Sequence, residues 1–272
     1  MKKAFKTFLK SPLCVTLVWL LGVVIIWEIG AAYIASVKRT PENVLPHIHK
    51  IIESVFSQKQ VSQGQTAIQI VASNAGATLT RAGIGFIIGA ALGFLLALAM
   101  RLSSVVEKTA FPYLMLIQMI PILGMAPIVL AVTKDIGASR IIIAAILTFY
   151  PVSTSTLAGF KAVDKEKYDL MRICAANKFQ LYVKTLIPSC VPYFFTGLKI
   201  SAPMAITASI LVDTLQGDGG LGCMLSQSLK LAMSIYVFWQ IVIFSAVIGI
   251  MSSWLIGVIE NFLSPHKRSI KV

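Results

Sequence analysis

The chain has 272 residues, of which 57% are hydrophobic and 13% are charged, and its formal net charge is +13. Several apolar runs reach about twenty residues, the length that a helix needs to cross a bilayer, so a soluble globular domain is excluded. The sequence predicts an all-α, polytopic integral membrane protein with about six transmembrane helices.

The positive charge follows the ends of the apolar runs and does not form one basic patch. On the predicted topology, fifteen of the 24 Lys and Arg residues lie on the side of the N-terminus. This bias is typical of cytoplasmic loops, whereas a nucleic-acid site gathers its cations on one face. Both termini are therefore placed in the cytoplasm, and no nucleic-acid partner is predicted.

The first division of the chain, 1–77, comprises an N-terminal tail, the first transmembrane helix and an outer loop. The run from Leu13 to Ile34 is too long for the core of a signal peptide, so we interpret it as a span. Glu28 lies near its outer end and is interpreted as an interfacial acid. His47 and His49 follow in the loop with no evident acidic neighbour, so no metal site is predicted.

The second predicted span, 79–100, carries a glycine at every fourth position: Gly85, Gly89 and Gly93. Small residues at this spacing lie on one helix face and let a neighbouring helix approach closely. We therefore predict that this face packs against another helix.

The third predicted span, 111–132, contains three prolines, which predict kinks or unwound backbone and indicate a helix of the translocation path. Gln118 either faces that path or bonds to a neighbouring helix. The candidate path residues in spans three to five are polar, kink-forming or methionine side chains: Gln118, Pro121, Met125, Tyr150, Met204, Thr207 and Asp213.

Asp213 leads into a glycine-rich stretch, 217–222, which predicts a tight turn at the outer end of the path. The last span is predicted at 235–259. The core of five spans thus covers 78–260, and 261–272 form a cytoplasmic tail.

Segment 161–192 is polar and charged although it lies between two apolar runs. Its periodicity predicts two short amphipathic helices joined by a bend and closed by Pro188 and Pro192, since proline disrupts helical hydrogen bonding. The segment follows an even number of crossings, so we place it in the cytoplasm between spans four and five. It is interpreted as a docking site for another protein; a surface anchor on anionic lipid is the alternative.

This segment resembles the cytoplasmic loop of bacterial ATP-binding-cassette importer permeases. That family's pattern is Glu-Ala-Ala, a glycine four residues later and a Leu-Pro end. Asp169-Leu170-Met171 stands at the head, Ala175 at the glycine and Leu186-Ile187-Pro188 at the end. A bend with positive φ at Ala175 would cost about 1 kcal/mol.

Two further stretches resemble the nitrate, sulfonate, taurine and thiamine-precursor subgroup of these permeases. They are Asn74, Thr78 and Arg81 before the second span, and the proline-bearing sequence 118–127 in the third.

The resemblance implies the permease subunit of an ATP-driven, binding-protein-dependent importer in the bacterial cytoplasmic membrane. Its cargo would be a nitrate-, sulfonate- or taurine-like anion or a small organic nutrient such as a vitamin precursor. The partners implied are a second copy of the chain, an extracytoplasmic solute-binding protein, membrane lipid and separate ATPase subunits that hold ATP and Mg²⁺. The implied ATPase-coupling residues are Asp169, Leu170, Met171, Arg172, Cys174, Ala175, Ala176 and Pro188.

No Walker A sequence, nucleophile elbow or paired-carboxylate motif occurs in the chain, so neither catalysis nor a cofactor is predicted for it. The alternative function is a stand-alone ion-coupled secondary transporter. Such proteins carry paired ionisable groups at mid-membrane. The acids within or beside the spans, Glu28, Asp213 and Glu260, all lie near span ends, which disfavours that alternative.

Overall fold

The computed structural model describes residues 12–62, 64–216, 219–230 and 235–263. These residues are mostly helical, which confirms the all-α prediction apart from one small hairpin of β1 (Gln60–Ser62) and β2 (Gln65–Thr66). The predicted N-terminal tail, most of the C-terminal tail and two residues of the glycine-rich stretch, 217–218, lie outside the described part of the chain.

Within the described residues, five helices are long and apolar enough to cross a membrane. Their bounds are α2 (Pro12–Val37), α4 (Ala67–Leu102), α7 (Ile136–Lys161), α10 (Ile187–Gln216) and α12 (Ile235–Leu263). A sixth crossing results if the bent pair α5 (Ser104–Met119) and α6 (Ile122–Thr133) is one broken span. The prediction of about six spans is thus confirmed, with one of them interrupted.

The interruption of the third predicted span lies at Pro121. Helix α5 ends at Met119, α6 begins at Ile122, and the two helices meet at 105°. Proline has no N–H to donate and its ring clashes with the preceding turn, so a helix ends here readily. Pro112 and Pro127 lie inside α5 and α6, so only the middle proline of the three ends a helix.

The described residues divide into two compact units. The first joins Met1–Val71 with Gln227–Ile241 and contains α2, α3 (Ile48–Phe56) and the hairpin. The second joins Ala72–Ser226 with Val242–Val272 and contains the other elements, including most of α4 and α12. The boundary lies close to the predicted division at residue 77, but a segment from late in the chain belongs to the first unit.

In the second unit the glycine face of α4 packs against α7. A Cβ atom added to Gly85 would lie 2.5 Å from the Ile141 carbonyl oxygen, and one added to Gly89 would lie 2.3 Å from that of Ala145. Real Cβ atoms do not approach oxygen so closely, so glycine permits this helix contact. The predicted packing role of the glycines is confirmed.

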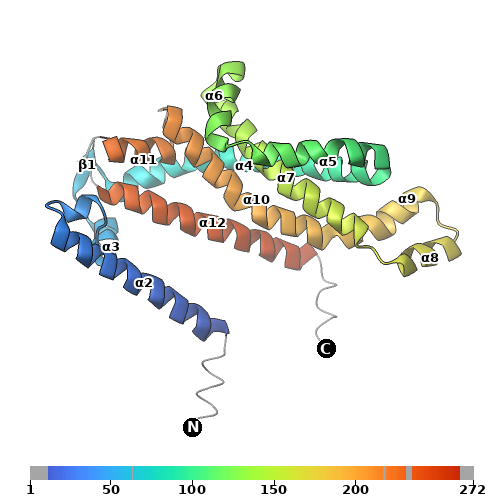
Figure 1. Ribbon diagram of the computed structural model, residues 1–272, viewed down its shortest axis with the longest axis horizontal. Coiled ribbons are helices and arrows are strands. Elements are labelled where there is room, and N and C mark those ends of the chain that lie inside the picture. Colours follow the sequence, from blue (N-terminus) through green and yellow to red (C-terminus); the bar gives the residue numbers. More distant parts are fainter. Residues whose placement is uncertain (1–11, 63, 217–218, 231–234, 264–272) are drawn as a thin grey trace, which may run out of the picture. The chain divides into compact units, whose positions relative to one another are not determined.

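Beyond the ends of α7 and α10 the chain forms α8 (Lys165–Ile173) and α9 (Lys178–Leu181), as Figure 1 shows. The prediction that Pro188 and Pro192 close the second short helix is wrong. Helix α9 passes through a π turn, Tyr182–Leu186, directly into α10, which contains both prolines. A π turn rearranges the backbone hydrogen bonds just ahead of Pro188, so the missing donor does not end the helix.

Candidate functional site

The segment between α7 and α10 exposes large apolar side chains although it lies outside the membrane-crossing helices. Leu170 is 58% exposed, Ile173 is 83% exposed and Phe179 is 75% exposed, and α8 has no buried residue. When such groups lie together on a surface, they mark a site that another molecule covers. We call Leu170, Ile173 and Phe179 the apolar docking patch.

The coupling residues taken from the family resemblance surround this patch. Six of them are exposed: Asp169, Leu170, Arg172, Cys174, Ala175 and Pro188. The other two, Met171 and Ala176, are half-buried. Ile173 and Phe179, the most exposed members of the patch, were not among the predicted coupling residues. Phe179 belongs to the apolar periodicity that predicted the second short helix, so its signal was present in the sequence, whereas Ile173 does not belong to the periodicity of the first.

Ala175 ends α8 in the left-handed conformation, with φ of 47°. The Ala175 N–H donates to the Arg172 carbonyl and the Ala176 N–H to the Met171 carbonyl, each at 3.0 Å. This pair of bonds is the Schellman motif, in which glycine usually takes the left-handed position. The bend therefore does require positive φ, and Ala175 adopts it with a Cβ atom that glycine lacks.

Segment 161–192, which we call the coupling segment, contacts Arg101 near the end of α4. Both the side chain and the backbone of Arg101 take part. Its guanidinium donates to the Tyr168 hydroxyl of α8 and lies 5.9 Å from the centre of the same ring. Its carbonyl accepts from the Tyr182 hydroxyl of the π turn at 3.5 Å. The end of α7 is also fixed, because Lys161 pairs with Glu107 of α5. A displacement of α8 would therefore move the end of α4 through the contact between Tyr168 and Arg101.

At the other end of α10, a buried polar network joins three helices. Arg140 Nε of α7 lies 2.5 Å from Asp213 Oδ1 of α10, and both side chains are 0% exposed. Thr78 of α4 donates to Asp213 Oδ2 at 2.7 Å. Arg81 adds a second positive charge near this carboxylate. Buried charges require such partners, since an isolated one would pay a large desolvation cost.

The same network holds the glycine-rich turn before α11 (Leu221–Lys230). The Arg140 Nη2 atom donates to the Gly219 carbonyl at 3.1 Å, and the Gly220 N–H donates to Asn74 Oδ1 at 3.0 Å. Gly219 and Gly220 have φ of 74° and 96°, and a Cβ at Gly220 would lie 2.2 Å from Asp213 Oδ2. The predicted tight turn is confirmed, and glycine is required by conformation and by space.

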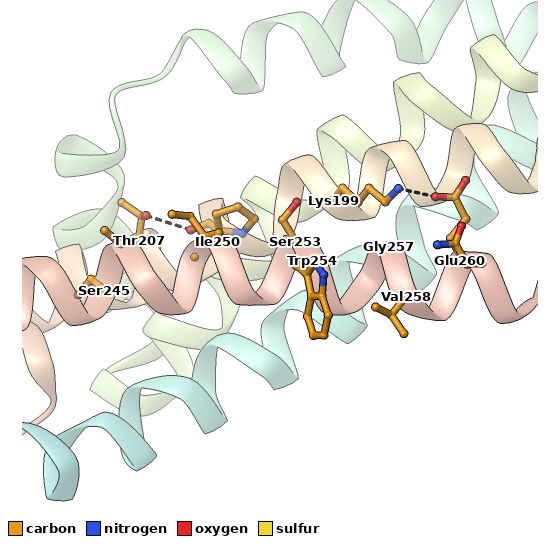
Figure 2. A pocket seen from close by; sticks show the side chains of 13 residues that line it. Lys199, Thr207, Ser245, Ile250, Ser253, Trp254, Gly257, Val258 and Glu260 are labelled. Atoms are coloured by element: carbon orange, nitrogen blue, oxygen red, sulfur yellow. Dashed lines mark hydrogen bonds and ion pairs between the residues drawn. The ribbon is translucent and has the colours of Figure 1, made fainter. Parts of the chain in front are cut away.

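Asp213, a candidate path residue, is enclosed by this network, and its carboxylate is fully buried among the described residues. Thr207, by contrast, lines an open groove of about 850 Å³ between α10 and α12. Figure 2 shows this groove with the ion pair of Lys199 and Glu260 toward one end.

The other predicted path residues do not surround one cavity in the described chain. Gln118 and Pro121 are exposed, while Met125, Tyr150 and Met204 are half-buried. The Tyr150 hydroxyl faces the Met115 sulfur at 3.6 Å, which links α7 to α5.

Comparison with protein families gives one match, to the family described as binding-protein-dependent transport system inner membrane component, over residues 89–264. The match includes α5 to α11 and therefore the whole coupling segment and most of the outer network.

Curated relatives resemble the chain over most of its length. The formylaminopyrimidine transport permease protein ThiX of Halalkalibacterium halodurans is 29% identical, over 91% of this chain and 94% of the relative. The nitrate import permease protein NrtB of Synechocystis is 25% identical, over 98% and 95%. A putative aliphatic sulfonates transport permease protein, SsuC of Bacillus subtilis, is 23% identical, over 91% and 85%.

Solved structures with a similar fold are also transporters. One is an inward-facing form of the MetNI methionine ABC transporter, with a TM-score of 0.63 and 13% identity over 71% of this chain and 96% of that one. An amino acid ABC transporter with histidines aligns with a TM-score of 0.61 and 19% identity, over 71% and 94%. At such identities the likeness shows the fold alone.

Proposed function

Because the chain belongs to the family of inner membrane components of binding-protein-dependent transport systems, we propose that it couples ATP hydrolysis on separate ATPase subunits to solute import. The apolar docking patch carries this proposal. It lies beyond the membrane-crossing helices, on a segment that Arg101 and Lys161 tie to α4 and α5. An ATPase that covers the patch would hold the ATP and Mg²⁺, and its movement would shift the spans through these ties.

Two copies of the chain would form the translocation path. Gln118 is exposed on α5. An amide facing hydrocarbon without a partner costs several kcal/mol, roughly 4–8 on a cyclohexane scale. A second copy that covers the break at Pro121 would remove this cost and would place Gln118 in a polar interior.

The orientation of the chain in the membrane follows from the position of the apolar docking patch. The ATPase, and hence the docking patch between α7 and α10, belongs in the cytoplasm. The positive-inside bias of the loops supports this placement, with both termini in the cytoplasm. The extracytoplasmic binding protein would then approach the opposite face of the spans.

For the substrate we propose a small organic nutrient of the size of the solutes for which the relatives are named. Within the described spans, Arg140 pairs with Asp213 and Lys199 pairs with Glu260, and Arg81 lies near the Asp213 carboxylate. A dedicated nitrate or sulfonate site would need a cation that is not already neutralised in this way. The half-buried Met125, Tyr150 and Met204 suit a flat organic ring.

The test uses two phenylalanines with matched exposure. Phe179 in the docking patch is 75% exposed, and Phe56 at the end of α3 is 81% exposed. We expect Phe179→Glu to lose the co-purifying ATPase and transport, because a carboxylate placed in an apolar contact must be desolvated. Phe56→Glu should retain the ATPase.

Three measurements read the result: the amount of chain in the membrane, the ATPase recovered with it, and solute uptake. Ile173→Glu should repeat the effect of Phe179→Glu. Normal ATPase recovery with both patch variants would refute the patch as the docking surface. Recovery of a lone chain that moves solute down an ion gradient would refute the importer function itself.

A further inference from the structure

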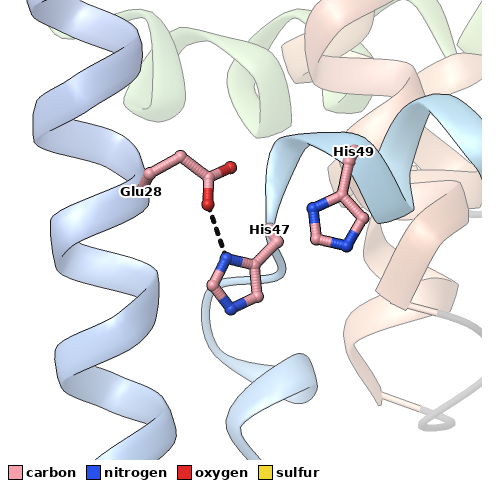
Figure 3. Close-up of side chains that lie close together, drawn as sticks. All are labelled: Glu28, His47 and His49. Carbon is pink, nitrogen blue, oxygen red and sulfur yellow. Dashed lines mark hydrogen bonds and ion pairs between the residues drawn. The ribbon is translucent and has the colours of Figure 1, made fainter.

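Three chemically matched side chains come together at the junction of α2 and α3, within the first unit (Figure 3). Glu28 belongs to α2, His47 is the N-cap of α3, and His49 lies in the first turn of α3. Their possible ligand atoms, one carboxylate oxygen and two ring nitrogens, all lie within 4.8 Å of one another. Nothing local in the sequence indicates this cluster, because the acidic partner lies 19 residues before His47 and on another helix.

We propose that Glu28, His47 and His49 bind a divalent transition-metal ion of the Zn²⁺ class. Two imidazoles and one carboxylate suit Zn²⁺, Co²⁺, Ni²⁺ and Cu²⁺, whereas Mg²⁺ and Ca²⁺ prefer oxygen ligands alone. Three protein ligands leave one position of a tetrahedral ion for water.

The geometry needs only small adjustments to accept such an ion. Bonds of about 2.0–2.1 Å to a tetrahedral Zn²⁺ place the ligand atoms roughly 3.3 Å apart. Glu28 Oε2 and His47 Nδ1 are closer than this, at 2.6 Å, because they share a proton. The ion takes the place of that proton, which is released to water. His49 is exposed, so its ring is free to turn toward the pair.

The backbone already holds the carboxylate in position. Glu28 Oε1 accepts the Ile48 N–H at 2.9 Å, so one oxygen caps α3 while the other faces the imidazoles. The N-terminus of α3 carries a partial positive charge of about +0.5, which opposes a cation. The full negative charge of Glu28 outweighs it, and the nearby cation Lys50 is paired with Glu42.

A metal ion here would fasten the first span to the outer helix α3. It would join side chains from two elements, α2 and α3, that are connected by a linker containing only one 3₁₀ turn, Pro41–Asn43.

The experiment uses the full chain in detergent, purified with an affinity tag that contains no histidine and stripped with a chelator. Zn²⁺ is titrated, and bound metal per chain and the thermal unfolding midpoint are measured. We expect one Zn²⁺ per chain and a raised midpoint, with no change on adding Mg²⁺. Co²⁺ in place of Zn²⁺ should give the visible absorption of a four-coordinate site.

The decisive variant is His49→Ala, which removes a ligand from an exposed position and leaves the pair of Glu28 and His47 intact. It should fold normally and bind Zn²⁺ at least about tenfold more weakly. Glu28→Gln should do the same, while His266→Ala, which changes the third histidine of the sequence, is the control and should bind like the wild type. Absence of stoichiometric Zn²⁺ binding, or equal affinity in His49→Ala and His266→Ala, would overturn the site.

Discussion

Arg140 and Asp213 form an ion pair in which neither side chain is exposed, with 2.5 Å between Nε and Oδ1. The pair joins α7 to α10; Thr78 also donates to Asp213, and Arg140 also donates to the Gly219 carbonyl. Such a pair adds little net stability compared with apolar residues of the same volume, but removing one partner leaves a buried charge.

Asp213→Asn should therefore lower the free energy of unfolding by about 3–5 kcal/mol. The matched control is Asp164→Asn, because Asp164 pairs with Lys167 at 3.5 Å on the surface and such pairs contribute about 0–1 kcal/mol. Thermal unfolding in detergent compares the two variants. A double change, Arg140→Met with Asp213→Leu, should recover much of the loss; similar midpoints for both Asp→Asn variants would contradict the argument.

Replacing glycine by alanine should change the stability in opposite directions at two positions of α4. Gly83 has nothing within 4 Å of an added Cβ, whereas a Cβ at Gly89 would lie 2.3 Å from the Ala145 carbonyl oxygen. Gly83→Ala should raise stability by about 0.5–1 kcal/mol, since alanine is the better helix former. Gly89→Ala should lower it by about 1–3 kcal/mol by pushing α7 away. Unfolding midpoints of the two variants test the difference, and a gain at Gly89 would refute the close contact.

Ala175 is a site where glycine should be better than the native residue. Its φ of 47° is unfavourable for alanine, so Ala175→Gly should stabilise the chain by about 1 kcal/mol. Ala176→Gly is the control: it makes the same chemical change at a residue without positive φ, and it should destabilise by about 0.4–1 kcal/mol. The two unfolding midpoints should move in opposite directions; a shared direction would mean that the bend stores no strain.

A variant at the contact between Arg101 and Tyr168 tests the transmission of movement to the spans separately from the docking of the ATPase. Tyr168→Phe removes the hydroxyl that accepts from the guanidinium but leaves the apolar docking patch unchanged. We expect the ATPase still to co-purify, while its stimulation by substrate-loaded binding protein falls several-fold. Tyr113→Phe, at an exposed position of α5, is the control. Full stimulation in Tyr168→Phe would show that the signal does not pass through Arg101.

Local signals in the sequence predicted the features that depend on one segment. The spacing of Gly85 and Gly89 predicted the packing face, Pro121 the break, and the glycine cluster the turn before α11. These predictions succeeded because the backbone freedom and the side-chain size of a residue affect the structure at its own position.

Features that need two distant segments escaped prediction. The pairing of Arg140 could not be predicted, because nothing near it in the sequence indicates Asp213 as its partner. Likewise, Glu28 and His47 belong to different helices, and their contact depends on how the outer loop folds back. The continuity of α9 with α10 was missed because the rule that proline ends helices takes no account of a preceding π turn.

Because α9 continues through the π turn into α10, these elements form one continuous helix that can move as a rod. The helix from Lys178 to Leu215 has 38 residues, so it is roughly 57 Å long at about 1.5 Å per residue. If it pivots as a rod at one end, a tilt of about 5° moves the other end by about 5 Å, close to the pitch of one helical turn. Phe179 stands at one end of this rod and Asp213 at the other. Under the proposed function, a tilt that leaves the ATPase contact intact would therefore be large enough to displace the glycine-rich turn.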